Sequence, residues 1–396
     1  MRKSLVLFIA AVMLVTAVPA FAELQNVTVG GSIRIRGNWY DRDDVNTLSF
    51  VEQRTRLNVK ADFTDEVGAL IELDSYDVWG EDFRSDYISG VDARARTTRD
   101  VEVYQAYIEA NEMFGYPLRL RIGRQELALG SEWLVGTNDV SSRYTGLSFD
   151  AIRLTYATDM VSVDALWAKL VERSPAEEDG DADLYGIYAS YLGIEDVTID
   201  AYWLFVRDAA RVTGSLDTHT FGLRGAGTLG MLDFEAELAY QLCDWDDACG
   251  DDDWDNWAAN LEIGYTFDMN YTPRVFLGGA WFEGDDEDGV FWRLYSNWEY
   301  SQFLDNTGLT NVWLGRAGVS MMPTETLTAA LLVSYLEIDE DFGADDDLGW
   351  EVEVNLCYAY SEDLSFELGY AHLFEGDAIA GDDDLDYAWF ETKICF

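Results

Sequence analysis

The last twelve residues of the chain, 385–396, alternate between two kinds of side chain. One parity is apolar or small and the other is mainly polar: the first comprises Ala388, Phe390, Thr392, Ile394 and Phe396, and the second includes Glu391 and Lys393. A period of two is the pattern of a β-strand with one apolar and one polar face. The chain is therefore expected to finish on a strand whose two faces meet different surroundings.

The same alternation recurs along the whole chain and predicts eighteen strands, with sixteen as the alternative count. The expected ranges are 24–40, 50–63, 67–80, 100–111, 118–127, 148–158, 160–170, 184–192, 197–207, 217–226, 231–243, 254–267, 273–284, 309–322, 326–340, 348–360, 364–374 and 385–396. Short connections such as 64–66 and 193–196 take turns with long ones such as 81–99, 128–147 and 285–308. This regular change of length is typical of bacterial outer-membrane β-barrels, whose short turns face the periplasm.

Charged residues inside the runs favour a transmembrane barrel over a soluble two-sheet β protein. In the second run, Arg54, Arg56 and Lys60 occupy one face and apolar side chains the other. A Lys or Arg that faces the bilayer midplane costs roughly 2–4 kcal/mol, so the charged face must line the lumen. A final strand that ends in phenylalanine also resembles the signal read by the barrel-assembly machinery. We therefore predict an all-β, antiparallel up-and-down barrel in the outer membrane of a Gram-negative bacterium, with both termini in the periplasm.

Two further features agree with a barrel. Tryptophans near the ends of runs match the aromatic girdles of membrane barrels; these are Trp39, Trp79, Trp203, Trp281 and Trp389. The prolines after the first twenty residues fall between runs or, for Pro273, at the boundary of a run, as expected when every strand is paired on both sides; these are Pro117, Pro175, Pro273 and Pro323.

The first 22 residues have the three parts of a secretory signal peptide. Arg2 and Lys3 precede an apolar run from 5 to 18, and Ala20-Phe21-Ala22 supplies a small-residue cleavage site. The run is too short for a transmembrane helix, and no later run reaches the roughly 18 apolar residues that such a helix requires. We expect residues 1–22 to be removed and residues 23–396 to form the barrel domain.

The charge is distributed unevenly around the predicted barrel. Residues 23–160 hold 15 Lys and Arg against 24 Asp and Glu, whereas residues 161–396 hold 9 against 51. Parity places arginines of the early runs in the lumen, and Arg124 from the same region is added to them. The expected pore-lining residues are Arg34, Arg36, Arg54, Arg56, Arg119, Arg121, Arg124 and Arg153. It places carboxylates of later runs on an opposite acidic wall, namely Asp233, Glu235, Glu237, Glu262, Glu351 and Glu353.

Arg124 has the opposite parity from Arg119 and Arg121. It reaches the lumen only if Gly123 forms a bulge that changes its direction, or it belongs to the following loop.

Charge alone leaves two interpretations of the lumen open. Facing charges can simply neutralise each other and keep the lumen wet, or the arginines can guide an anion, because the guanidinium group matches carboxylate and phosphate geometry.

Other chemistry has weak support in the sequence. Cys243 and Cys249 flank an acidic loop and are a candidate disulfide. The acidic segments lack the spacing of a calcium loop, so we expect no metal site or cofactor and interpret them as a solvated surface near lipopolysaccharide. The strong negative charge argues against a nucleic-acid partner. No nucleophile motif appears, so we expect no enzymatic activity.

Several segments resemble the alginate-export family of outer-membrane porins. They are the runs at 118–127, Gly130 with 134–136, the arginines of 33–36 and 54–57, and the segments 105–107, 149–153 and 294–311. The resemblance covers most of the mature chain and implies an eighteen-stranded barrel with an arginine-rich constriction for an anionic polysaccharide or a related solute. The acidic later half of this chain differs from a uniformly electropositive channel.

Together these observations predict a monomeric porin for passive passage of hydrophilic solutes, with anionic saccharides guided by the arginines. The segments 128–147 and 285–308 are expected to fold inward and narrow the channel. Two alternatives stay open at this point: a general or cation-selective porin, and a structural barrel that sheaths a partner such as an electron carrier.

Overall fold

The structure is a computed structural model that describes residues 24–42, 45–80, 101–139, 146–173, 180–210, 214–247, 250–285, 289–305, 308–340, 345–379 and 384–396. The expected signal peptide, residues 1–22, lies outside the described residues. Within those ranges, no helix has the length and apolar character that a bilayer span requires.

Eighteen antiparallel strands form one closed sheet, in agreement with the predicted fold class and strand count. In chain order they are β1 (Asn26–Arg42), β2 (Val45–Asp62), β3 (Val67–Val78), β4 (Glu102–Ala110), β5 (Leu118–Gln125), β6 (Phe149–Ala157), β7 (Val161–Val171), β8 (Ala182–Ile194), β9 (Val197–Asp208), β10 (Ser215–Leu229), β11 (Leu232–Asp247), β12 (Gly250–Thr266), β13 (Arg274–Phe282), β16 (Val312–Thr324), β17 (Leu327–Ile338), β18 (Asp347–Ala359), β19 (Leu364–Glu375) and β20 (Leu385–Cys395). A separate two-stranded hairpin, β14 (Gly284–Asp285) with β15 (Gly289–Val290), lies in the connection before β16.

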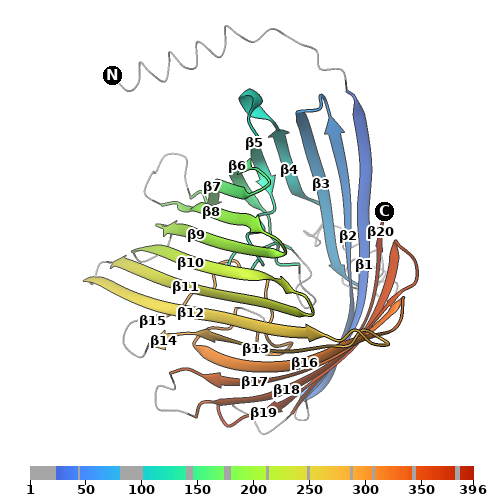
Figure 1. The fold of residues 1–396 in the computed structure, drawn as a ribbon. Helices are drawn as coiled ribbons and strands as arrows, with labels where there is room; N and C mark the ends of the chain where they lie inside the picture. The colour runs from blue at the N-terminus through green and yellow to red at the C-terminus, as the bar shows by residue number, and fades with distance from the viewer. Residues whose placement is uncertain are drawn as a thin grey trace, which may run out of the picture.

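Each strand pairs with its neighbours in sequence, and β20 returns to β1 to close the barrel (Figure 1). The closing register pairs Arg34 with Lys393 and Arg36 with Glu391, so the final strand adjoins the early arginines as expected. Phe396 donates its backbone N–H to Gly31 and completes the seam. The start of β1 and the end of β20 therefore lie at one end of the barrel, which we name the turn end; the long connections are at the loop end.

The outward parity of the strands is apolar and exposed, as a surface in contact with lipid hydrocarbon requires. Leu277 and Ile108, for example, are 69% and 61% exposed. Four of the five predicted girdle tryptophans lie on this outer parity, and they are Trp39, Trp79, Trp203 and Trp281. The assignment of Trp389 to a girdle is wrong. It shares the inward parity of Glu391, is 2% exposed, and donates its indole N–H to Glu367.

Two long connections fold into the lumen, as the sequence predicted for 128–147 and 285–308. Their described residues form a dry core with the inward side chains of the wall, including Trp133, Leu134, Phe291 and Tyr300. The two connections also bind each other, because Gly136 donates its N–H to the carbonyl of Tyr295. We name residues 126–139 the first inward loop and residues 291–305 with 308–310 the second inward loop.

Two local irregularities in the strands were not expected. The register of β3 and β4 shifts between Glu72 and Leu73, so that Tyr104 is an extra residue and turns inward beside Gln105. Such a bulge changes the direction of a side chain. Pro323 lies inside β16 rather than between runs, but it sits where the ladder to β17 is interrupted, so no ladder hydrogen bond is lost.

Candidate functional site

The site begins with two arginines placed directly opposite each other. Arg34 of β1 and Arg54 of β2 are cross-strand partners near the middle of both strands, and both side chains are buried inside the barrel. Like charges in such a pair repel each other. Arg36 and Arg56 lie two residues away on the same inward parity. We name these four residues the arginine cluster; it needs counter-ions to be stable.

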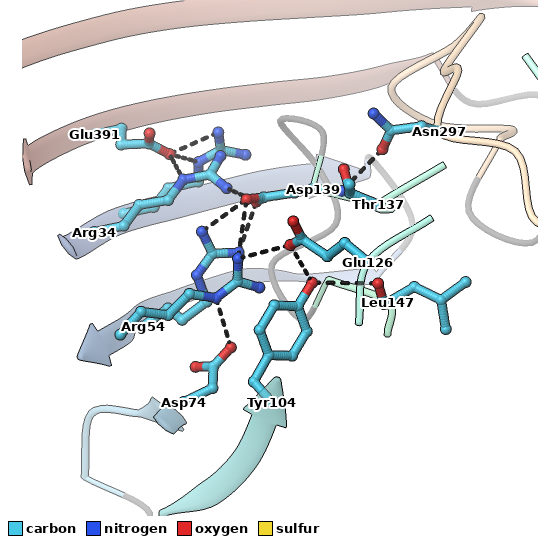
Figure 2. A network of polar contacts seen from close by, with 12 residues as sticks. Arg34, Arg54, Asp74, Tyr104, Glu126, Thr137, Asp139, Leu147, Asn297 and Glu391 are labelled. Atoms are coloured by element: carbon cyan, nitrogen blue, oxygen red, sulfur yellow. Dashed lines mark hydrogen bonds and ion pairs between the residues drawn. The ribbon is translucent and has the colours of Figure 1, made fainter. Parts of the chain in front are cut away.

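One counter-ion comes from the first inward loop. The carboxylate of Asp139 accepts hydrogen bonds from both terminal nitrogens of Arg54, at 2.6 and 3.0 Å, and from Nη1 of Arg34 at 3.3 Å. Nη1 of Arg56 lies 3.5 Å from the same carboxylate. Figure 2 shows Asp139 pointing from the loop toward the guanidinium groups of β1 and β2. A single carboxylate therefore binds three arginines.

The loop that carries Asp139 is fixed by its own polar contacts. The backbone N–H of Asp139 donates to the side chain of Asn297 in the second inward loop, at 2.8 Å. Two residues earlier, Thr137 donates its backbone N–H to Glu132 at 2.7 Å. The position of the Asp139 carboxylate thus depends on both inward loops.

The strands provide the other counter-ions of the cluster. Glu391 of β20 lies 2.8 Å from Nε of Arg34 and 2.8 Å from Nη2 of Arg36. Asp74 of β3 accepts a hydrogen bond of 2.8 Å from Nε of Arg56. These partners follow from the register, since Glu391 is opposite Arg36 and Asp74 is opposite Arg56. The strand pattern alone therefore neutralises part of the cluster.

Tyr104 and Glu126 complete the surroundings of Arg56. The bulge in β4 places the Tyr104 ring under the guanidinium of Arg56, with Cζ 3.8 Å from the ring centroid. Such a contact is favourable because the ring face is electronegative. The Tyr104 hydroxyl donates to Glu126 at 2.7 Å, and Glu126 lies 3.6 Å from Nη1 of Arg56.

The two loop carboxylates differ in acidity because their surroundings differ. Burial alone would raise the pKa of Asp139, but the hydrogen bonds and charge of Arg54, with the charges of Arg56 and Arg34, hold it below its ordinary value. Burial raises the pKa of Glu126 above its ordinary value, and Tyr104 and Arg56 offset only part of that effect. Glu126 is therefore the first of the pair to take up a proton as the pH falls.

The three predicted arginines nearer the turn end also face the lumen. Arg121 binds Glu109 at 2.6 Å, and Arg153 binds Asp164 at 2.8 Å. Among the eight predicted arginines, Arg119 is the one without an ion pair to any residue that the structure describes. Its charge acts on the nearby carboxylates of Glu109 and Asp164 without a direct ion pair, and it lies between the turn end and the arginine cluster.

The placement of Arg124 among the pore-lining residues is wrong. The ladders of β5 show no register shift at Gly123, so no bulge turns the next side chain inward. Arg124 stays on the outer parity with Ile122 and forms a two-pronged ion pair with Asp150, at 2.9 Å for each hydrogen bond. Both side chains are about half exposed, at 45% and 56%.

The predicted acidic wall faces inward, but it is not bare. Arg224 binds Glu235 at 3.0 Å, and its Nε lies 3.9 Å from Glu237. Glu262 is shared by Arg274 at 2.9 Å and Arg316 at 2.7 Å, and Arg274 also binds Asp233. The picture of one basic wall facing one acidic wall therefore needs correction, because each region of the lumen is neutralised by its own neighbours.

Glu351 and Glu353 are not opposite the arginine cluster. They belong to β18, which only β19 and β20 separate from β1. The carboxylate of Glu351 holds the second inward loop by accepting the backbone N–H of Gln302 at 2.9 Å and the hydroxyl of Ser301. The side chain of Gln302 also reaches Glu353, at 3.5 Å. These carboxylates anchor a loop, whereas parity indicated only that they face inward.

Asp139, Tyr104 and Glu126 are the main residues of the site that sequence reasoning missed. Asp139 lies in a segment expected to fold inward, but its target depends on the path of that loop. Tyr104 is revealed only by the bulge. Cys249 lies outside the described residues, so the disulfide with Cys243 stays a prediction. No cluster of three His, Cys, Asp or Glu suited to a metal ion occurs in the described ranges.

Comparisons with known proteins agree with this geometry. A protein-family model described as alginate export matches residues 25–390. No curated protein matches the chain. Among solved structures of Pseudomonas aeruginosa, OpdL is similar with 15% identity and a TM-score of 0.65, covering 94% of this chain and 99% of that chain. OccK2 (OpdF) is similar with 13% identity and a TM-score of 0.62, and the match covers 94% of this chain and 98% of that chain. The structure of OpdK with vanillate is similar with 13% identity and a TM-score of 0.60, and the match covers 93% of this chain and 98% of that chain.

Proposed function

We propose that this chain, which belongs to the alginate export family, passes anionic hydrophilic solutes along its arginine cluster. The family and the fold make it an outer-membrane porin channel in a Gram-negative bacterium. Carboxylate-bearing saccharides are the solute class that fits this cluster best. One similar structure holds vanillate, itself a small carboxylate, which is in line with that class.

The observation that carries the proposal is the position of the Asp139 carboxylate. Three guanidinium groups from two strands converge on it, and the shortest contact is 2.6 Å. Planar guanidinium groups bind carboxylates in this two-pronged manner. The cluster is therefore a carboxylate site that the chain fills with its own side chain, and a uronate carboxylate has the same chemistry.

Passage then requires an exchange of carboxylates. With short turns in the periplasm, the turn end receives solutes from that side, where Arg119 of β5 adds positive charge. A solute carboxylate that displaces Asp139 satisfies the arginines as the loop moves away. The arginines then lose no counter-ion, so the cost of moving the loop is offset by the new ion pairs.

A cation-selective porin is the second candidate, because one observation favours it. Every lumen arginine named above except Arg119 already has a carboxylate partner among the described residues, and the chain carries a formal net charge of −49. If Asp139 does not leave the cluster, the excess of carboxylates decides selectivity. The sheath alternative is disfavoured, because the inward loops occupy space that a partner protein would need.

Reversal potentials across planar bilayers under a KCl gradient distinguish the two candidates. The informative variant is Arg54→Gln, because Arg54 makes the shortest contact with Asp139. Arg124→Gln is the matched control, since it removes the same charge from the outer face. We expect anion preference that falls in Arg54→Gln and persists in Arg124→Gln. Cation preference that Arg54→Gln leaves unchanged would refute the proposal in favour of the second candidate.

A further inference from the structure

A cavity at the loop end lies between the second inward loop and the wall, with Asn138 of the first inward loop also in its lining. It has a volume of about 540 Å³, within the usual range for small-molecule sites. Aromatic rings from both sides form much of its lining: Trp245 and Trp254 come from β11 and β12, and Phe291, Trp292 and Tyr295 come from the loop. We name it the aromatic pocket.

The charged side chain of the aromatic pocket is already neutralised. Nη1 of Arg293 donates to both carboxylate oxygens of Asp305, at 2.7 and 2.9 Å, and both side chains are almost fully buried. Nη2 of Arg293 donates to the carbonyl of Trp298 at 2.6 Å and to the hydroxyl of Ser296 at 3.1 Å. Arg293 therefore serves mainly to fold the loop, and Asp305 already neutralises its charge, although its buried Nε has no hydrogen-bond partner among the described residues.

Two of the four hydroxyl groups that line the aromatic pocket are engaged within the loop. Thr310 donates its hydroxyl to the backbone carbonyl of Phe291, and Ser296 accepts the backbone N–H of Trp298 at 3.1 Å. A saccharide needs several polar partners for its hydroxyl groups, and burying them without partners is costly. Apolar faces of aromatic rings suit a ligand with few polar atoms.

The aromatic pocket adjoins a wider cavity. Leu147 and Tyr295 line both, and the wider cavity measures about 890 Å³. Its lining includes Asp74, Tyr104 and Arg124, so it lies at the loop end, where β4 and β6 begin and β5 ends. Asp74 and Tyr104 also contact Arg56, so the wider cavity borders the arginine cluster.

From these features we infer that the aromatic pocket is a binding site for a neutral, ring-shaped apolar molecule, such as a phenol or a fused aromatic alcohol. The accessible rings of the pocket stack on the ligand, and the neutralised charge of Arg293 gives an anion little advantage over a neutral molecule. This inference goes beyond the proposed passage of anionic solutes and does not depend on it.

Calorimetric titration of the full chain in nanodiscs tests the inference with two probes of equal ring size. The neutral probe is 2-naphthol and the anionic probe is 2-naphthoate, both at neutral pH. We expect 2-naphthol to bind at one site and 2-naphthoate to bind at least about tenfold more weakly, because the anion loses hydration without gaining a partner. Empty nanodiscs correct for partition of the probes into lipid.

Three variants locate the binding. Trp292→Ala removes one ring from the pocket and should weaken 2-naphthol binding roughly 3- to 10-fold, the range for one aromatic contact. Val290→Phe places an extra ring in the pocket and should weaken binding further. Trp257→Ala is the control, because this tryptophan lies on the outer parity of β12 and is 40% exposed; it should bind like the wild type.

Several outcomes would overturn the inference. The first is that 2-naphthol does not bind. The second is that Trp292→Ala and Val290→Phe bind 2-naphthol as tightly as the wild type does. The third is that 2-naphthoate binds as tightly as 2-naphthol. Displacement of 2-naphthol by a neutral monosaccharide would instead indicate a sugar site. Because Val290→Phe keeps every native ring, it tests the site even if Trp292→Ala disturbs the loop, and each variant is compared with the wild-type circular dichroism spectrum.

Discussion

Replacing Asp139 by Asn should release the first inward loop from the arginine cluster. The substitution keeps the size of the side chain and removes the charge that binds Arg54, Arg34 and Arg56. A hydrogen bond to a charged group contributes roughly 1.5–3 kcal/mol. The Asp139 side chain is 24% exposed, which places the loss toward the lower end. A loss of about 2 kcal/mol shifts the balance between the bound and the released loop by about 30-fold.

The same substitution also changes the electrostatic potential of the lumen. A unit charge about 6 Å from a passing ion contributes roughly 0.7 kcal/mol in water and about 3 kcal/mol at an effective dielectric constant of 20. For a wet lumen we take about 1 kcal/mol, which corresponds to roughly a fivefold change in the permeability ratio. Both effects favour anions in Asp139→Asn.

Single-channel recordings in planar bilayers measure both effects. The open fraction gives the loop equilibrium, and the reversal potential under a salt gradient gives the permeability ratio. Asp150→Asn is the matched control, since Asp150 binds Arg124 with two hydrogen bonds of 2.9 Å on the outer face. We expect a larger open fraction and stronger anion preference in Asp139→Asn alone. Recordings that match those of the wild type, or a shift toward cations, would refute the reasoning.

Two further predictions concern the inward loops. Trp133→Ala should loosen both loops, because Trp133 is 1% exposed and donates to the Tyr300 hydroxyl at 2.8 Å; its loss costs roughly 3–5 kcal/mol of packing. We expect faster proteolysis of the loops and a larger conductance in this variant. A proteolysis rate equal to that of the wild type would contradict the packing argument. Acidification should strengthen anion preference, because the raised pKa of Glu126 means that it protonates before Asp139 and leaves Arg56 more positive. The folded loop binds this proton more tightly than the unfolded chain does, so protonation of Glu126 does not weaken the loop. The share of the pH effect that comes from Glu126 should be lost in Glu126→Gln; a pH dependence identical to that of the wild type in this variant would assign the whole effect to other groups.

Much of the barrel could be predicted because strand parity is a local property. The alternation in each run decides which side chains face lipid, and eighteen runs gave the strand count and the inward position of Arg34, Arg54 and Glu391. Trp389 shows the limit of reasoning from residue type. Its position near a strand end suggested a girdle, although its parity with Glu391 already placed it in the lumen.

The rest of the site depends on contacts between distant segments. Asp139 meets Arg54 only because the first inward loop crosses the lumen, and no periodic pattern describes a loop. Tyr104 faces Arg56 because of a bulge, which adds one residue to a strand without a clear signal in the sequence. The parity of Glu351 predicts only that its side chain faces the lumen. Its contacts with the second inward loop depend on Ser301 and Gln302, which lie fifty and forty-nine residues away along the chain.

Swelling of liposomes that contain the purified protein tests the central claim most directly. Glucose and glucuronate have nearly the same size and differ in one carboxylate, so the ratio of their rates measures recognition of that group. We predict that glucuronate enters at least as fast as glucose through the wild type, and that Arg54→Gln slows glucuronate while leaving glucose unchanged. Admission of glucose with exclusion of glucuronate, or no swelling with either sugar, would contradict an arginine-guided channel for anionic saccharides.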